Sequence, residues 1–452
     1  MTQDPERIAA ADTALVEQLV ERAKAAGAEA ADAILLRSTA ISHAQRLGEV
    51  ERLEREESLD LGLRVLIGRR QAMVSTTDHD ADSLSALIER AVAMAKVVPE
   101  DRWCGLAEPE QLAHDHPDVE SNDPVEPTPE ALIERARACE EAARAVPGIT
   151  NSEGAEASWG STRVSLAATN GFRGTYVGSR HSVGVSVLAG EGLEMQRDYD
   201  FTSTVFGADL ENPAVVGRRA GERAVGRLKP RKPRTAKLPV VLDPRMASGL
   251  LRSLIGAISG PAVARGTSFL KDKLGEAIFA PGIRIIDEPH RRRGLRSRPF
   301  DGEGLPTREQ AIIDDGRLTT WLLDLASARQ LGMAPTGHGS RGVSGPPGPS
   351  CSNVWLAPGS RSPQELIGEI EEGFYITEMI GMGVNPVTGD YSRGAGGFWI
   401  EKGEITTPVS EATVAGNLLT MYAGLTPAND LDLRFGIDSP TVRIDGLTVA
   451  GA

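Results

Sequence analysis

Seven histidines and three cysteines are the residues of this 452-residue chain best suited to metal or nucleophilic chemistry. A zinc peptidase needs neutral imidazole or thiolate ligands, with a carboxylate beside them that takes a proton from the bound water. None of the histidines is followed by glutamate, so every H-E motif is absent. A G-x-S-x-G motif and a P-loop are also absent. The chain therefore carries no complete motif for zinc, serine-hydrolase or nucleotide chemistry.

Two partial motifs have simpler explanations. Residues 78–89, DHDADSLSALIE, place acids at an EF-hand spacing, but Ser83 stands where the calcium loop needs glycine. A helical pattern starts at Leu84, so we expect these acids to cap a helix. Residues 337–342, GHGSRG, match G-x-G-x-x-G, yet they follow a predicted helix instead of opening one. His338 and Cys351 nearby are only two ligands, which are too few for a metal site.

The elements that would position any site alternate between helices and short strands. The periodicity predicts a helix before Gly27, a strand meander over 31–77, a helix from Leu84, and a helix that starts at Pro129 behind an N-cap at Thr128. Residues 151–205 read as further strands, with the Asn170-Gly171 pair as a hairpin turn.

A break near residue 235 divides the chain. Residues 229–237, KPRKPRTAK, read as a linker, and the strand LPVVLDP follows it. Next comes a helix capped by Asp243 and ended by Gly260 and Pro261, then short strands and two helices, over 322–331 and 362–373. We therefore expect an α+β protein with an N-terminal domain, 1–235, of mostly antiparallel sheet with flanking helices. The C-terminal domain, 236–452, should combine an antiparallel sheet or barrel-like core with helices.

The composition restricts the function further. The net charge is −14, which repels nucleic-acid phosphates. The basic run 217–237 has nine Lys or Arg but no interleaved aromatic residue. A solvated helix face that leads into the linker therefore explains this run better than a nucleic-acid patch. The odd number of widely spaced cysteines fits a reducing compartment. An export signal and an apolar stretch long enough to span a bilayer are both missing, so we expect a cytoplasmic protein outside the membrane.

Several phrases along the chain resemble the PmbA/TldE family, long labelled modulators of DNA gyrase and related to the TldD peptidases. The phrases are GEVERLEREESLDLGLRVLIGRRQAMVSTTD, FLKDKLGEAIF, RPFDGEGLPTREQAIIDDGRLTTWLLDLASARQLG, GVNPVTGDYSRGAGGFWIEKGEI and PTVRIDGLTVAG. Their order and spacing cover nearly the whole chain, which makes the resemblance specific.

The resemblance implies that this chain lacks the catalytic zinc. In the catalytic relatives, the first helix of the second domain carries H-E-x-x-x-H, and this sequence has Arg252, Ser253 and Ala257 at those positions. Arginine presents only donors, alanine has no side-chain lone pair, and serine is a poor base without a partner. The cysteine that precedes the closing strands of the relatives is also missing from GLTPANDLDLRF. The loss of each ligand matches the non-catalytic TldE side of the family.

The family picture implies a cytoplasmic heterodimer in which a TldD-like subunit holds the zinc, and it leaves open whether this chain forms a homodimer when that partner is absent. This chain would hold no cofactor and would complete a chamber for flexible or unfolded peptides, which bind extended along a sheet edge. Contacts to peptide or partner are expected from Arg252 and from the Gly-rich loop 383–396, at Asn385, Thr388, Gly389 and Asp390. A plain hairpin turn explains the same loop residues equally well.

Two other functions stay open at this point. The first is an autonomous metallopeptidase or other hydrolase with ligands not recognised above, such as His338 and Cys351. The second is a gyrase-linked or nucleic-acid-binding modulator that acts through Arg218 to Lys237.

Overall fold

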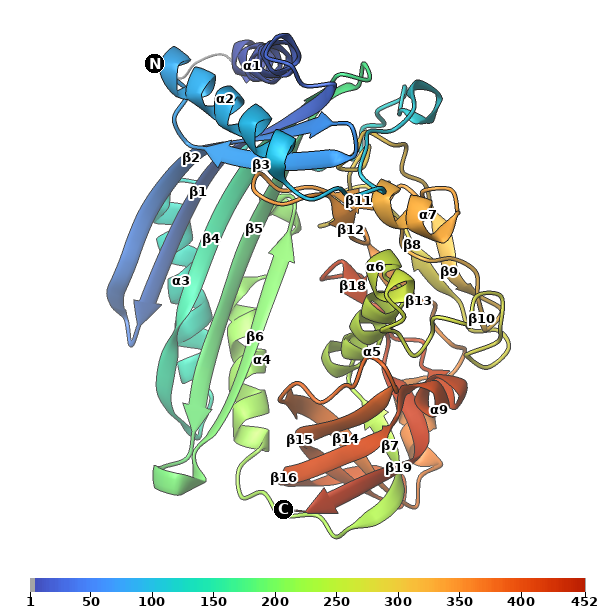
Figure 1. The fold of residues 1–452 in the computed structure, drawn as a ribbon. Coiled ribbons are helices and arrows are strands. Elements are labelled where there is room, and N and C mark those ends of the chain that lie inside the picture. Colours follow the sequence, from blue (N-terminus) through green and yellow to red (C-terminus); the bar gives the residue numbers. More distant parts are fainter. Residues whose placement is uncertain (1–4, 452) are drawn as a thin grey trace.

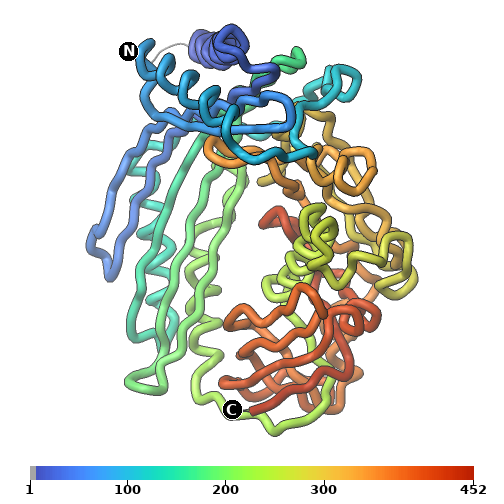
Figure 2. Tube along the Cα trace, in the orientation of Figure 1, coloured from blue at the N-terminus to red at the C-terminus, as the bar shows by residue number. Residues whose placement is uncertain are grey.

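The computed structural model describes residues 5–451 and divides into two halves, with long antiparallel strands in the first and a barrel in the second (Figure 1). The chain passes from one half to the other near the bottom of Figure 2, in the segment that follows α4 (Pro213–Gly226). The α+β prediction is confirmed. The predicted division at 235/236 falls in that segment, before β7 (Ala236–Leu242), and stays a prediction.

A six-stranded antiparallel sheet forms the N-terminal half, in the order β3-β2-β1-β4-β5-β6. The meander predicted over 31–77 is its first three strands, and the Asn170-Gly171 turn joins β4 to β5. The strands are β1 (Ala30–Arg46), β2 (Glu49–Ile67), β3 (Arg70–Thr76), β4 (Ile149–Ala168), β5 (Arg173–Ala189) and β6 (Gln196–Thr204).

Helices cover one face of this sheet. Successive side chains of a strand point to opposite faces, so the apolar residues on this face need a covering layer. The helices are α1 (Pro5–Ala25), α2 (Ala81–Val97), α3 (Pro129–Arg144) and α4, and 3-10 turns lie at Pro109–Gln111, Gly192–Glu194 and Gly207–Asp209. The first two helices pack on β1 to β3, and α3 and α4 pack on β1 and β4 to β6. The predicted caps are confirmed, because Thr128 accepts the Ala131 N–H and Asp80 accepts the N–H groups of Asp82 and Ser83.

Loops from the C-terminal half cover the upper part of the opposite face. Phe300, Leu305 and Val343 pack there against Ile34 and Leu166 of the sheet. The approach is so close that a Cβ on Gly62 of β2 would lie 2.4 Å from the carbonyl oxygen of Val343. The two halves are therefore packed together at this end.

A closed five-stranded barrel is the core of the C-terminal half, in the order β16-β15-β14-β7-β19, with β16 pairing back to β19. The short strand β17 extends β19 at one side. The strands other than β7 are β14 (Glu372–Ile380), β15 (Asp390–Glu401), β16 (Glu404–Asn417), β17 (Leu425–Pro427) and β19 (Val442–Gly451).

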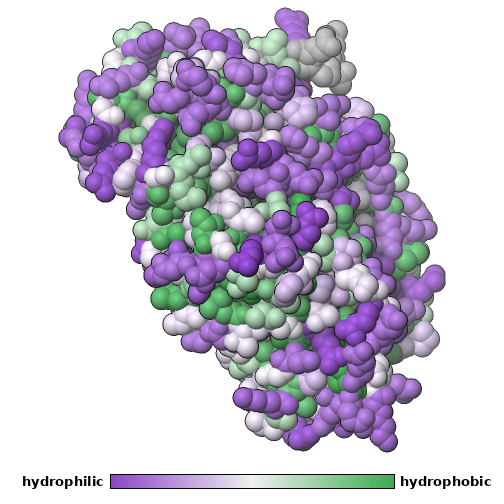
Figure 3. Space-filling model, turned by 90° about the vertical axis from the view of Figure 1, so that its right-hand side faces the viewer, coloured by the Kyte–Doolittle hydropathy of each residue, from purple (hydrophilic) through white to green (hydrophobic). Residues whose placement is uncertain are grey.

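Smaller sheets and helices surround the barrel. The strands are β8 (Ile285–Asp287), β9 (Gln310–Asp314), β10 (Arg317–Leu318), β11 (Gly339–Ser340), β12 (Gly348–Pro349), β13 (Val354–Leu356) and β18 (Ile437–Asp438). The helices are α5 (Pro244–Ala257), α6 (Gly260–Ala264), α7 (Leu325–Leu331), α8 (Pro363–Gly368) and α9 (Leu418–Ala423). Figure 3 shows one face of the molecule, where hydrophilic residues surround smaller hydrophobic patches.

Three predicted helix limits were wrong. Gly260 and Pro261 begin α6 instead of ending α5, because proline suits the first turn of a helix. The helix predicted over 322–331 starts only after its N-cap, Asp324. The one predicted over 362–373 ends at Gly368, because the chain enters β14 at Glu372 to pair with β7 and β15. No helix of the described residues is both long and apolar enough to cross a membrane.

Candidate functional site

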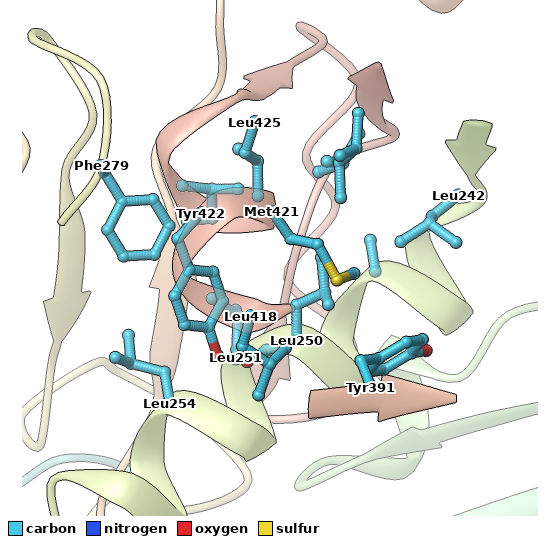
Figure 4. Close-up of a cluster of buried hydrophobic side chains, with 14 of the residues drawn as sticks. Leu242, Leu250, Leu251, Leu254, Phe279, Tyr391, Leu418, Met421, Tyr422 and Leu425 are labelled. Atoms are coloured by element: carbon cyan, nitrogen blue, oxygen red, sulfur yellow. Dashed lines mark hydrogen bonds between the residues drawn. The ribbon is translucent and has the colours of Figure 1, made fainter. Parts of the chain in front are cut away.

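Helix α5, which carries the predicted zinc-motif positions, is firmly packed in the C-terminal half. Asp243 caps it by accepting the Met246 N–H at 2.9 Å, and Pro244 occupies the first turn. Burial raises the pKa of the Asp243 carboxyl. On its inner face, Leu250, Leu251 and Leu254 pack beside α9, as Figure 4 shows. The hydroxyl of Tyr422 on α9 donates to the carbonyl oxygen of Leu250 at 3.0 Å.

The donor set on α5 does not fit zinc. Arg252 is exposed, and Ala257 is buried and offers no lone pair. The Ser253 hydroxyl donates to the backbone oxygen of Gly249 at 3.0 Å, a bond within the helix. Across residues 5–451, no group of three or more His, Cys, Asp or Glu side chains is arranged to hold a metal ion. We therefore derive no chemical step through a metal on this chain.

The predicted contact loop is a tightly bonded hairpin between β14 and β15. The side-chain oxygen of Asn385 accepts the N–H groups of Val387 and Thr388, and the Thr388 hydroxyl donates to Asp390 at 2.7 Å. Thr388 and Asn417 hold the pKa of the Asp390 carboxyl below its ordinary value by donating hydrogen bonds to it. Gly389 takes a φ of +78°, which only glycine adopts readily. These groups shape the turn, and a contact to peptide or partner stays a prediction.

The hairpin loop is shorter than expected, and no hydrogen bond links it to Arg252 within the described residues. Residues 390–396, predicted as loop, belong to β15 because they pair with β14 and β16 in the barrel. Arg252 makes no hydrogen bond or ion pair within the described residues. The exposed side chains of Ile380, Met382 and Val387 instead give the hairpin an apolar tip.

A cleft of about 470 Å³ between the two halves was not predicted. Asp198 of β6 lies at its centre, with its Oδ1 3.2 Å from Nη1 of Arg245 and its Oδ2 3.3 Å from Nη1 of Arg227. Arg227 also pairs with Glu378 of β14, and Arg245 donates to the carbonyl oxygen of Thr377 at 3.3 Å. Guanidinium groups thus tie the N-terminal sheet to the barrel.

Three arginines of the basic run, at 219, 223 and 227, take part in this cleft, so the prediction of a solvated helix face is wrong for them. The basic residues of the following linker, 229–237, are exposed as predicted. Arg219 pairs with Asp200 and Glu211, and Arg223 lies 3.0 Å from Asp200. The sequence did contain a signal. Arginines at 219, 223 and 227 share one helical face, and the acids at 198 and 200 share one strand face. A nucleic-acid surface is disfavoured, because these cations are already bound to carboxylates.

The pair considered for an independent hydrolase, His338 and Cys351, is buried. Nε2 of His338 lies 2.6 Å from Oδ2 of Asp287, and its Nδ1 lies 2.8 Å from the hydroxyl of Thr336. Burial raises the pKa of the Cys351 thiol, which disfavours the nucleophilic thiolate. Neither side chain is open to a substrate.

Comparison with known protein families identifies this arrangement. The C-terminal half, residues 235–451, matches the model of the PmbA/TldA metallopeptidase C-terminal domain, residues 122–228 match the central domain and residues 31–95 match domain 1. Metalloprotease PmbA of Escherichia coli O157:H7 is 38% identical over 95% of this chain and 93% of its own length. The chain belongs to the PmbA/TldD metallopeptidase family. The resemblance found in the sequence is therefore confirmed.

Solved structures of PmbA/TldD relatives share the whole fold. A Bacteroides thetaiotaomicron protein, provisionally described as a modulator of DNA gyrase, has a TM-score of 0.90 and 29% identity over 97% of this chain and 98% of its own. TldE from Thermococcus kodakarensis has a TM-score of 0.86 over 97% of this chain and 100% of its own, at 22% identity, which shows the fold alone. The two-half architecture is thus common to both structures.

Proposed function

We propose that this PmbA/TldD family member is the non-catalytic, TldE-like subunit of a zinc metalloprotease complex. The carrying observation is the replacement of the three zinc-motif positions on α5 by Arg252, Ser253 and Ala257. A cation, a hydroxyl and a methyl group cannot take the place of two zinc ligands and a base. The scaffold that presents them is intact, since α5 is capped and its buried leucines belong to the core of the C-terminal half.

The proposed contribution of the chain is a wall of the peptide chamber around the partner's zinc. Figure 1 shows α5 on the side of the C-terminal half nearest to the N-terminal sheet. Arg252 of this helix is exposed, and we propose that its guanidinium pairs with a carboxylate of a peptide or of the partner. The hairpin residues Asn385, Thr388, Gly389 and Asp390 are the second proposed contact.

The substrates in this proposal are flexible or unfolded peptides. An unfolded peptide can present an extended backbone to a sheet edge along its whole length, and main-chain hydrogen bonds give little sequence selectivity. The partner is a TldD-like subunit that supplies the zinc, and the complex is cytoplasmic.

The test is peptide hydrolysis by three preparations: this chain alone, the TldD-like subunit alone, and both together. Unstructured peptides are the substrates, and EDTA is the inhibitor. We expect EDTA-sensitive hydrolysis only when the TldD-like subunit is present, with a higher rate for the complex. EDTA-sensitive hydrolysis by this chain alone would overturn the proposal. The matched control replaces the zinc ligands of the TldD-like subunit, which should abolish the activity of the complex.

A further inference from the structure

The first part of β2 is a free strand edge. Strand β3 pairs only with Leu61–Ile67 of β2, so residues 49–60 pair with β1 on one side and with no described strand on the other. We call residues 49–60 the hairpin edge. In Figure 1 the β1–β2 hairpin projects at the outer side of the sheet. Such an edge presents a row of backbone N–H and C=O groups that a strand of another chain can pair with.

The helical layer does not extend over the hairpin edge. His43 and Gln45 of β1 are 0% and 4% exposed, but the residues paired with them on β2, Leu53 and Val50, are 48% and 63% exposed. Leu47 in the connecting turn is 46% exposed. Two exposed aliphatic side chains therefore lie on this exposed part of β2, and a third lies in the adjoining turn.

The turn at the end of this edge is already ordered. Glu140 of α3 accepts the backbone N–H groups of Leu47 and Gly48 at 2.7 and 3.0 Å, and also the side-chain amide of Gln45 at 2.9 Å. A partner that adds a strand here would not have to order the hairpin first, which lowers the entropic cost of binding.

The charge of the edge selects the partner. Six acidic residues against two arginines give residues 49–60 a net charge of −4. Both arginines are already paired within the chain, Arg52 with Glu54 and Glu156, and Arg55 with Glu57 and Glu126. Within residues 5–451, the acids at 49, 51 and 56 have no ion pair. A second copy would bring −4 against −4, so the edge favours a basic strand from a different chain.

We propose that the hairpin edge is the docking surface for the TldD-like subunit, which adds a basic strand to β2 and covers Leu47, Val50 and Leu53. This assignment rests on the proposed function. It accounts for the exposed aliphatic residues, the unpaired backbone and the uncompensated acids by a single contact. It also explains why the contact forms between unlike subunits.

The test measures binding of the purified TldD-like subunit to three forms of this chain at low and high salt. The hairpin variant is E49K/E51K/E56K. The control variant, E110K/E309K/E404K, reverses the same number of exposed glutamates on other elements. We expect the control to bind like the wild type and the hairpin variant to bind at least tenfold more weakly at low salt. The difference should shrink at high salt, because salt screens the charges.

A second measurement, amide hydrogen exchange of the wild-type chain, does not depend on the folding of any variant. Backbone amides within residues 49–60 should exchange more slowly in the complex than in the free chain. Equal binding by the hairpin variant, or unchanged exchange at these amides in a formed complex, would overturn the docking assignment and leave the proposed function standing. Self-association of this chain with protection of the same amides would assign the edge to a second copy. If the wild-type chain bound no TldD-like subunit at all, the proposed function itself would fail.

Discussion

The guanidinium of Arg245, in the first turn of α5, donates to the carboxylate of Asp198 on β6, with 3.2 Å between Nη1 and Oδ1. This contact joins α5 to the sheet of the other half. The side chains of Asp198 and Arg245 are only 3% and 11% exposed. Asp198 also pairs with Arg227, so one carboxylate bridges two guanidinium groups, and each of these has a second carboxylate partner, Glu378 for Arg227 and Asp243 for Arg245.

Replacing Asp198 with alanine should therefore be strongly destabilising. Arg227 and Arg245 would each lose one of two carboxylate partners, while Glu378 and Asp243 would remain. Because a hydrogen bond to a charged group contributes about 1.5–3 kcal/mol, we expect a loss of about 2–4 kcal/mol. The free energy of unfolding from denaturant titration measures the effect. Asp432→Ala is the control, because Asp432 lines the same cleft with its side chain 73% exposed and should cost less than about 0.5 kcal/mol. Similar losses from both variants would show that Asp198 does not join the halves.

The neighbouring carboxyl groups of Glu303 and Asp301 should make the free energy of unfolding depend on pH. Burial and the neighbouring Asp301 raise the pKa of Glu303 to about 8, from 4.5 for the free side chain. The two carboxylates lie close together, since a Cβ on Gly339 would be 2.8 Å from Glu303 Oε2 and 2.9 Å from Asp301 Oδ2. Because the folded-state pKa is the higher one, the native protein binds the extra proton, and stability falls as pH rises from about 4.5 to 8.

The variant Glu303→Gln tests this dependence. Its amide oxygen can still accept the Leu325 N–H that Glu303 accepts at 2.8 Å, but it does not titrate. The loss of stability between pH 5 and 8 should then shrink by on the order of 3 kcal/mol. Unfolding free energies of both proteins across this range give the answer. Parallel curves for the two proteins would refute the role of Glu303.

A substitution at Gly217 on α4 tests how closely α3 and α4 pack in the helical layer over the sheet. A Cβ there would lie 1.9 Å from the carbonyl oxygen of Cys139 on α3. Gly217→Ala must push the two helices apart, so we expect a loss of about 3 kcal/mol or more in unfolding free energy. Gly256→Ala on α5 is the matched control, because nothing lies within 4 Å of its added Cβ. The control should be neutral or stabilise by roughly 0.5 kcal/mol. Equal effects at both sites would contradict this packing.

Arg252 tests the proposed chamber wall. Its exposed side chain has no partner in the described structure, so Arg252→Ala should change the unfolding free energy by less than about 0.5 kcal/mol. The same variant should lower peptide hydrolysis by the complex, because it removes the donor that we propose contacts peptide or partner. Arg144→Ala, at an exposed position of α3, is the control. Full activity with Arg252→Ala would remove this residue from the proposed contacts.

Local signals in the sequence located most of the elements. Thr128 before Pro129 and Asp243 before Pro244 are caps whose side chains bond the first turn, so their helix starts were predicted correctly. The Asn170-Gly171 turn is equally local. The helix ends were harder, because Gly368 and the entry into β14 at Glu372 depend on pairing with distant strands.

The residues that line the cleft could not be grouped from the sequence either, because tertiary packing brings them together. Residues 198, 227 and 245 belong to β6, the end of α4 and α5, and only the packing of the two halves brings them together. Their charges could be read from the sequence, but their partners could not. The assignment of Arg252, Ser253 and Ala257 on α5 to the zinc-motif positions rests on the sequence resemblance and stays a prediction.

The most direct measurement of the central claim is the zinc content of this chain, purified alone and in complex with a TldD-like subunit. Elemental analysis after dialysis should find no stoichiometric zinc in the isolated chain and one zinc per complex. One tightly held zinc per isolated chain would contradict the account.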